Sequence, residues 1–192
     1  MEPHINTLYL CHRKALHYME EIKEKNILLW NHSVNAANIA LAIAKEMKLN
    51  KDKLDRIYTG ALLHDYGKVN IPNRILYKTG NLDNDEWLEI KKHPIMGYEL
   101  LKKDKNMTGI LPIIKSHHER PDGKGYPDGL NKMNLETAIV SASDALEVMM
   151  SGRPYQREKN NIDIWLEFNK NKGTQFDIKV AETVLIVLEK TF

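Results

Sequence analysis

The sequence has little of what marks secreted, fibrous or membrane-spanning proteins. It has one cysteine, Cys11, in 192 residues, so it cannot form an internal disulfide, which is typical of a reducing, cytoplasmic compartment. Ten glycines and seven prolines exclude a collagen-like chain. Its apolar runs, such as residues 184–188, are far shorter than the roughly 20 residues that a membrane span needs. We therefore expect a cytoplasmic protein that does not cross a membrane.

The charges are nearly balanced, with 28 Lys and Arg against 26 Asp and Glu and a net charge of +2. This balance gives no support for a broad basic surface, and we expect no DNA partner. No charged segment followed by an apolar run opens the chain, so we expect no signal peptide. A hydrophobic content of 42% excludes a disordered chain. The length predicts one main domain.

Apolar residues recur at intervals of three or four along nearly the whole chain, which is the pattern of amphipathic helices. No alternating strand pattern of useful length accompanies them. The sequence therefore predicts an all-α protein, a multi-helix bundle with no significant sheet. The clearest stripes are Leu8, Cys11, Ala15, Met19 and Ile22; Val34, Ala37, Leu41, Ala44 and Met47; Leu54, Ile57, Ala61 and Leu62; and Phe176, Val180, Val184 and Val187.

Capping residues and loop formers divide this pattern. Asp83 followed by Glu86 predicts a helix start with a capping box, and we expect that helix to continue through residues 93–100. Pro112 predicts the first turn of a short helix that ends near residue 118, and Asn134 predicts the cap of the next helix. Segments 69–81 and 120–131, rich in Gly, Pro and Asn, predict two structured loops. Residues 1–30 are expected to form a short accessory helix, and residues 31–192 the main domain.

Five of the eight histidines, together with two aspartates, form a candidate set of metal ligands. Imidazole and carboxylate are the ligand types of borderline and hard transition metals. An aspartate directly after a histidine suits a binuclear site, because a carboxylate can bridge two ions while an imidazole binds one. Such paired metals activate water and stabilise a phosphoryl displacement. The set is His32, His64, Asp65, His93, His117, His118 and Asp144.

A single histidine on a helix is far more often an ordinary surface or core residue than a ligand. We interpret His4, His12 and His17 in that way. His64 and Asp65 differ because they end the apolar run of residues 61–63. Ionisable groups seldom follow a buried run unless they are paired or bind a metal.

The residues that carry a family resemblance lie in three blocks. Residues 63–68 (LHDYGK), followed by Ile71 and Pro72, resemble the signature of the HD superfamily of metal-dependent phosphohydrolases. Residues 117–120 (HHER) and 122–127 (DGKGYP) resemble the second signature, which defines the HD-GYP subfamily. Ser151 and residues 153–155 (RPY) resemble a third block. The resemblance runs from about residue 31 to residue 192 and identifies that region as an HD-GYP catalytic domain.

The resemblance implies hydrolysis of cyclic di-GMP to linear pGpG, with further cleavage to GMP left open. A hydroxide that bridges two metals would be the nucleophile. Asp65 would bridge the two ions; His32, His64 and Asp144 would complete one position, and His93, His117 and His118 the other. Iron or manganese is the expected metal, and the ligand types also allow zinc.

Several further residues match positions that contact substrate in the family. Lys68 would stabilise the negative charge that develops on the phosphate, as a catalytic residue; an ordinary lysine at a helix end is the alternative. Arg153 would bind a phosphate with its planar fork. Arg120, Tyr126 and Tyr155 are the other expected substrate contacts.

The sequence departs from the family pattern at two places that bear on function. Leu28 occupies the position where some members carry a glutamate that supports a third metal, so we expect two metals. Gln156 follows the RPY block where a basic residue is common, so we expect one of the family's phosphate contacts to be weaker here.

Two other functions remain open at this point. The chain could be a non-catalytic receptor for a cyclic dinucleotide, or a module that binds a diguanylate cyclase through the Gly-Tyr-Pro loop. It could also hydrolyse cyclic GMP-AMP or another nucleotide. A homodimer formed through the stripe from Leu8 to Ile22 is a further possibility; packing of that stripe on the chain's own core is the simpler expectation.

Overall fold

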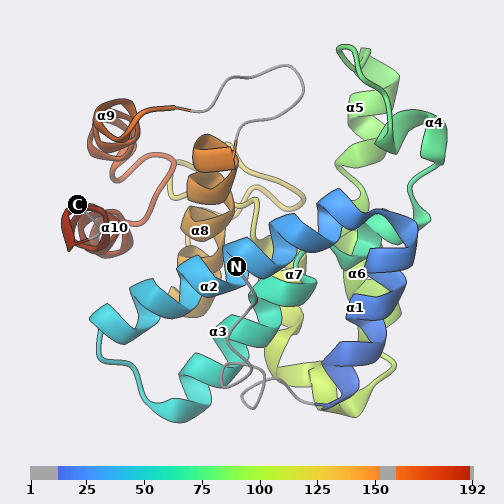
Figure 1. Ribbon diagram of the computed structural model, residues 1–192, viewed down its shortest axis with the longest axis horizontal. Helices are drawn as coiled ribbons and strands as arrows, with labels where there is room; N and C mark the ends of the chain where they lie inside the picture. Colours follow the sequence, from blue (N-terminus) through green and yellow to red (C-terminus); the bar gives the residue numbers. More distant parts are fainter. Residues whose placement is uncertain (1–12, 152–158, 191–192) are drawn as a thin grey trace.

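A computed structural model describes residues 13–151 and 159–190 and is all-α in those ranges (Figure 1). The exception to helix and loop there is an isolated bridge between Lys172 and Phe176. The predicted fold class is therefore confirmed. The elements are α1 (Arg13–Lys25), α2 (Ile27–Glu46), α3 (Lys51–Leu63), η2 (Tyr66–Asn70), α4 (Asn73–Leu76), α5 (Asn84–Ile90), α6 (His93–Leu101), η3 (Lys105–Ile110), α7 (Leu111–Ser116), α8 (Leu135–Ser151), α9 (Asn161–Asn171) and α10 (Ile178–Lys190).

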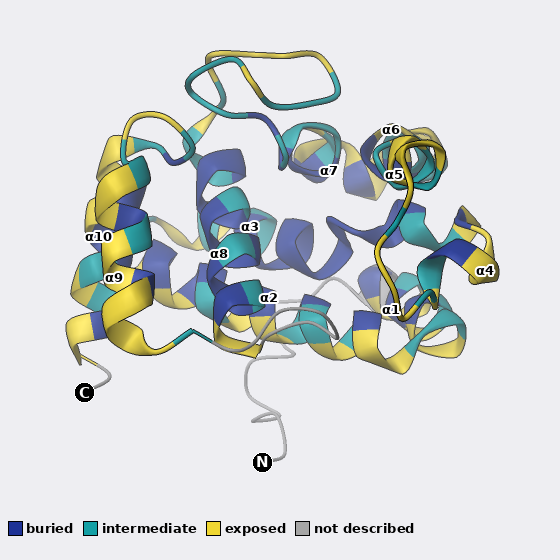
Figure 2. Ribbon diagram, turned by 90° about the horizontal axis from the view of Figure 1, so that it is seen from above, coloured by how far each residue is buried: buried dark blue, intermediate teal, exposed yellow. Residues whose placement is uncertain are grey.

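Helix α2 is the centre of the core. It packs along α3 and α8, and buried residues concentrate in these three helices while α4, α5, α9 and α10 turn exposed residues outward (Figure 2). Four buried alanines on α2, at positions 36, 37, 40 and 44, let neighbouring helices approach closely because they carry little volume. Because of this close packing, the sides of α2, α3 and α8 that face the core lie against one another.

Among the described residues, α2 is the one helix whose length and composition would allow it to cross a bilayer. Eight of its 20 residues are buried inside this molecule, so its apolar character is accounted for by its place in the core.

Helix α1 joins the same core. Ala15, Met19 and Ile22 are at most 5% exposed and belong to the central cluster of buried residues, with α1 packed on α2, α3 and η2. This part of the N-terminal stripe packs on the chain itself. Leu8 and Cys11 lie outside the described residues. The proposed boundary at residues 30 and 31 falls within the continuous helix α2.

The caps form as the sequence predicts. The Asp83 carboxylate accepts the Glu86 N–H, and the Glu86 carboxylate accepts the Asp83 N–H, which completes the capping box. The Asn134 side chain accepts the Thr137 N–H at 2.7 Å at the start of α8. Residues 120–131 are irregular, as expected.

The expectation of one continuous helix from residue 83 to residue 100 is wrong. The chain forms α5 and then α6, which begins at His93. Pro94 has no N–H to give to the carbonyl of Ile90, and its ring would clash with that carbonyl in a continuous helix. Two smaller differences concern segment 69–81, which contains the short helix α4, and α7, which ends at Ser116 rather than near residue 118.

Candidate metal centre

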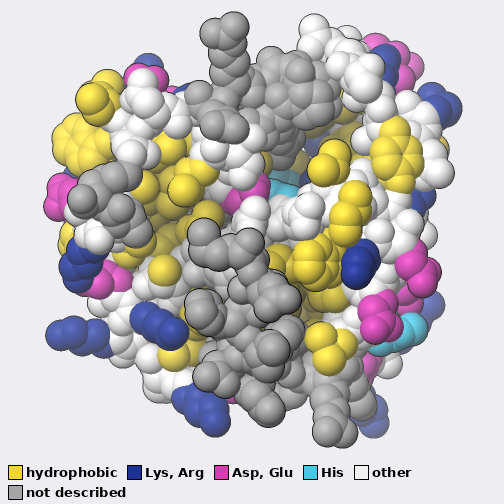
Figure 3. Space-filling view, in the orientation of Figure 1, with side chains coloured by type: hydrophobic (Ala, Val, Ile, Leu, Met, Phe, Trp, Pro, Cys, Tyr) yellow, Lys and Arg dark blue, Asp and Glu magenta, His cyan; other side chains and the backbone are white. Residues whose placement is uncertain are grey.

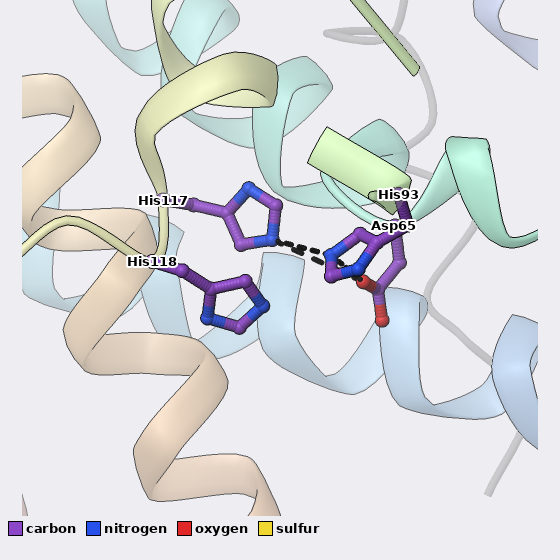
Figure 4. Close-up of side chains that lie close together, drawn as sticks. All are labelled: Asp65, His93, His117 and His118. Carbon is purple, nitrogen blue, oxygen red and sulfur yellow. Dashed lines mark hydrogen bonds and ion pairs between the residues drawn. The ribbon is translucent and has the colours of Figure 1, made fainter. Parts of the chain in front are cut away.

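The seven predicted ligands gather at one point in the core, although they come from distant parts of the chain. Among the described residues, six of them form two groups, and the ligand atoms within each group all lie within 4.8 Å of one another. The two groups share Asp65. One group is Asp65, His93, His117 and His118, whose side chains converge in Figure 4. The other is His32, His64 and Asp65. Figure 3 shows histidine and acidic surface at the bottom of a hollow on this face.

Asp144 joins the group that contains His32. Nε2 of His32 lies 3.2 Å from Oδ1 of Asp144 and 3.3 Å from Nε2 of His64. Nε2 of His64 lies 3.4 Å from Oδ2 of Asp65. These four side chains therefore point their ligand atoms at a common space from α2, from α8 and from the turn after α3.

The other oxygen of Asp65 faces the second group. Oδ1 of Asp65 lies 3.1 Å from Nε2 of His93 and 3.9 Å from Nε2 of His117. The Nε2 atoms of His93 and His117 are 3.1 Å apart. Each carboxylate oxygen of Asp65 thus faces one set of imidazoles, which is the arrangement that a bridging carboxylate requires.

Helix ends orient three of these histidines. Nδ1 of His64 lies 2.7 Å from the carbonyl oxygen of Ala61, and Nδ1 of His93 lies 2.7 Å from that of Ile90. Nδ1 of His117 pairs in the same way with the carbonyl oxygen of Ile114, at 3.0 Å. The last carbonyls of α3, α5 and α7 have no partner within their own helix. When Nδ1–H donates to such a carbonyl, the lone pair of Nε2 is directed at the cluster.

The break between α5 and α6 contributes directly to this arrangement. Because Pro94 lacks an N–H, the carbonyl of Ile90 is left for the His93 ring. The same residue that ends the predicted continuous helix therefore orients a candidate ligand.

Burial keeps the histidines of the second group, His93, His117 and His118, free of competing protons. Burial, with the neighbouring His118, lowers the pKa of His117 far below its usual range. Burial also lowers the pKa of His118 to about 3. Burial alone would raise the pKa of Asp65, but the charges of Lys68 and His64 hold it well below the usual value. At neutral pH these groups are therefore neutral imidazoles and an ionised carboxylate, the forms that bind metals.

His32 behaves differently. Burial alone would lower its pKa, but hydrogen bonds with Asp144 and Glu147 outweigh that effect and raise the pKa to about 9. A proton therefore neutralises part of the negative charge at this position, and a bound cation would take its place.

An unpaired oxygen in the cluster also indicates that these ligands suit a divalent cation. Oδ1 of Asp65 is buried and makes no hydrogen bond, and buried polar atoms normally have a partner. A cation between Asp65 and the surrounding Nε2 atoms would satisfy this oxygen. Imidazole and carboxylate together suit iron, manganese and zinc.

Lys68 lies against the cluster. Its Nζ is 2.6 Å from Oδ2 of Asp65, and its side chain is 15% exposed. The short helix η2 places it one turn after Asp65. A positive charge is thus held at the edge of the candidate centre, within reach of the hollow.

The Gly-Tyr-Pro loop is tied to the same place. Both oxygens of the buried Glu119 carboxylate accept backbone N–H groups of the loop, from Asp128 at 2.7 Å and from Leu130 at 2.8 Å. The ring of Tyr126 stacks on His118, with centroids 4.6 Å apart. The loop therefore packs against the ring of the candidate ligand His118.

The remaining predicted substrate contacts have different outcomes. Arg120 makes a two-point ion pair with Asp122 in its own loop, at 3.0 and 2.7 Å, so its guanidinium braces that loop. Arg153, Tyr155 and Gln156 lie outside the described residues.

Two buried carboxylates in this region had no role assigned from the sequence. Glu119 anchors the loop, and Glu147 contacts Nδ1 of His32 at 2.5 Å. The signal for Glu147 was its place three residues after Asp144, which puts both side chains on one face of α8. For Glu119 the signal was its position directly after two candidate ligands.

A model of the HD domain family matches residues 17–180. The cyclic di-GMP phosphodiesterase response regulator RpfG of Xanthomonas campestris is 37% identical over 155 residues, which are 78% of this chain and 40% of that protein. The cyclic di-GMP phosphodiesterase of Thermotoga maritima is 33% identical over 80% of this chain and 43% of that protein. The 3′3′-cGAMP-specific phosphodiesterase 1 of Vibrio cholerae is 31% identical over 70% of this chain and 32% of that protein.

The chain thus spans less than half the length of these curated relatives. Among solved structures, Bd1817, an HDG"Y"P protein from Bdellovibrio bacteriovorus, aligns with a TM-score of 0.65 at 22% identity, over 82% of this chain and 51% of that one. The HD domain of L. monocytogenes phosphodiesterase PgpH, in complex with cyclic-di-AMP, aligns with a TM-score of 0.65 at 20% identity, over 91% and 94%. These structures share the fold. The chain belongs to the HD domain family.

Proposed function

We propose that this chain is a metal-dependent phosphodiesterase that hydrolyses cyclic di-GMP to linear pGpG. The observation that carries the proposal is the shared carboxylate of Asp65, whose two oxygens face two separate sets of imidazoles. This arrangement suits two cations held close together, and such a pair can activate water for attack on a phosphodiester. Relatives named as cyclic di-GMP phosphodiesterases indicate the substrate.

Two divalent metals would occupy the two positions. His32, His64 and Asp144 would hold one, and His93, His117 and His118 the other, with Asp65 between them. When bound, such ions lower the pKa of water and neutralise charge on the phosphate. Iron or manganese is the proposed identity, and zinc is compatible with the same ligands.

The chain's own residues complete the chemistry. Asp65 stays ionised and fixes the spacing between the two positions. Lys68 places its ammonium beside the phosphate and stabilises the negative charge that develops there. Tyr126 stacks on His118 and helps to keep it in place, and it stays a predicted substrate contact. Arg120, Arg153 and Tyr155 stay predicted substrate contacts, and Arg153 is the one expected to bind a phosphate.

Turnover by the metal-loaded chain tests this function. The protein is loaded in turn with iron, manganese and zinc, its metal content is measured by elemental analysis, and cyclic di-GMP is followed by chromatography. We expect two metals per chain and conversion to pGpG. A His64→Ala, Asp65→Ala double variant should lose turnover while keeping its helical circular dichroism. His17→Ala, an exposed histidine outside the cluster, is the matched control and should keep full activity.

Binding of cyclic di-GMP without turnover under all three metals would contradict the proposal and favour the receptor. A panel that adds 3′3′-cGAMP decides the substrate, because relatives from Vibrio cholerae are named for that dinucleotide. If cGAMP is cleaved and cyclic di-GMP is not, the second candidate function replaces the first. Docking of a diguanylate cyclase on the Gly-Tyr-Pro loop, a homodimer and a cytoplasmic location stay predictions.

A further inference from the structure

His32 is held by a different kind of partner from the other oriented histidines. Among the described contacts, Nδ1 of His64, His93 and His117 each faces a neutral main-chain carbonyl at a helix end. His32 lies inside α2, where nearby carbonyls already accept N–H groups of the same helix. Within α2 no carbonyl near His32 is therefore left to accept from its ring, and a side chain takes that place.

Glu147 of α8 fills this position. Its Oε2 lies 2.5 Å from Nδ1 of His32, and the residue is 4% exposed. Its Oε1 accepts hydrogen bonds from Ser151 Oγ at 2.7 Å and from Asn35 Nδ2 at 3.3 Å. The carboxylate is therefore fixed from both helices, with one oxygen left for the imidazole.

The ligand and the residue that supports it are separated by three positions on both helices. Asp144 and Glu147 are three residues apart on α8, and His32 and Asn35 are three residues apart on α2, so each pair shares a helix face. On each helix one member faces the cluster and the other stands behind it. The packing of α2 on α8 thus positions the candidate ligand His32 and, at the same contact, the carboxylate of Glu147 that holds its ring.

A carboxylate that accepts the Nδ1–H of a histidine ligand differs from a main-chain carbonyl in two ways. A hydrogen bond to a carboxylate is stronger than one to a carbonyl, so it holds the ring more firmly. It also increases the electron density at Nε2 and makes the imidazole a better ligand. The other position gains no such charge, because His93 and His117 are supported by carbonyls.

The charges near the two positions are also unequal. Asp65 is shared. On the His32 side Asp144 and Glu147 add two carboxylates, against the single ammonium of Lys68 at Oδ2 of Asp65. The second group adds neutral imidazoles. A divalent cation is therefore attracted more strongly to the His32 side.

We propose that Glu147 is a positioning residue that makes the two metal positions unequal, so that the ion beside His32 is held more tightly than the ion beside His93 and His118. This inference rests on the two-metal part of the proposed function and does not require that cyclic di-GMP be the substrate. It predicts that the chain fills the two positions one after the other.

Metal titration of the full chain tests the inference. The protein is freed of metal with a chelator and titrated with Co²⁺, whose visible absorption reports on its ligands, and with Mn²⁺ in a calorimeter. The wild type should show two binding events of different affinity. Glu147→Gln should weaken the tighter event by roughly 10- to 100-fold, change its Co²⁺ spectrum and leave the weaker event unchanged. Thermal unfolding of the metal-free protein shows whether the variant is folded.

Glu136→Gln is the matched control, because Glu136 is on the same helix and pairs with Arg56 away from the cluster. It should titrate like the wild type. Ser151→Ala and Asn35→Ala remove only the bonds that aim the carboxylate, and each should weaken the same event by a smaller factor. They keep the inference testable if Glu147→Gln does not fold.

Equal weakening of both events, or of neither, in these variants would overturn the inference, as would a single event in the wild type. Two unequal events that depend on Glu147 in a chain that cleaves no dinucleotide would uphold the inference and overturn the proposed function alone.

Discussion

A Cβ atom added to Gly67 would stand 2.0 Å from the carbonyl oxygen of His93 and 2.6 Å from the backbone nitrogen of Gly97. Helix η2 therefore lies directly on the first turn of α6, with no room for a side chain. This contact brings Asp65, two residues before Gly67, to within 3.1 Å of Nε2 of His93. A glycine outside the cluster thus sets the distance between two candidate ligands.

We expect Gly67→Ala to destabilise the fold by about 1–3 kcal/mol, because the added methyl group overpacks a contact between two backbone segments. It should also weaken metal binding at the position of His93. Urea unfolding and metal titration measure the two effects. Gly80→Ala is the control, because a Cβ there meets nothing within 4 Å. Equal stability of the two variants would contradict this reading of the contact.

Glu119→Gln should loosen the Gly-Tyr-Pro loop. The carboxylate accepts one N–H with each oxygen, whereas an amide has one accepting oxygen and would leave a donor unpaired. We expect a loss of about 1–3 kcal/mol in the free energy of unfolding and faster proteolysis within residues 120–131. Glu99→Gln alters an exposed ion pair with Lys102 and should change neither quantity. An unchanged rate of cleavage in the loop would refute the anchoring role.

Lys68→Met should separate metal binding from turnover. Because Nζ contacts Asp65 at 2.6 Å, its removal takes away a positive charge that competes with a cation. We expect metal affinity that is equal or higher, with turnover of cyclic di-GMP reduced by about 10²- to 10³-fold. Elemental analysis and initial rates measure these effects. Lys190→Met removes an exposed ion pair with Glu46 and should leave both values unchanged. Loss of metal with loss of turnover would assign Lys68 a structural role instead.

Removal of metal should lower the stability of the whole chain. A ligand that binds only the folded state stabilises it by about 2.7 kcal/mol per site at a concentration of 100 Kd. A chelator should therefore lower the melting temperature, and added Mn²⁺ should restore it in a concentration-dependent way. Calorimetric scans measure the shift. The double variant His64→Ala, Asp65→Ala should show a much smaller response, and an equal response in this variant would place the stabilising ion elsewhere.

Much of the fold was predictable because it depends on local patterns. The stripes that include Ala37, Leu41 and Ala44 become the buried face of α2, since a 3.6-residue period directly reports which side faces the core. The capping box at Asp83 formed as expected, because it involves residues three positions apart. The break at Pro94 was missed because apolar periodicity continued across it.

The residues of the candidate site also fall into those that local sequence could predict and those that it could not. His64 and Asp65 were recognisable because they follow a buried run, and the structure brings all seven predicted ligands together. Glu147 was not recognised, because its role depends on the packing of α8 against α2 and not on its neighbours in sequence. The same holds for Gly67, whose closeness to His93 appears only in three dimensions.

The ligands of the centre enter from α2, α6 and α8 and from the turns that follow α3 and α7. Ions held among them would tie together segments from His32 to Asp144, closing several large loops of chain. Ions bound there would hold these segments together in the folded state and so disfavour its opening. In a protein with a single cysteine, the supply of metal in the cell would then govern how long each molecule survives proteolysis as well as how fast it works.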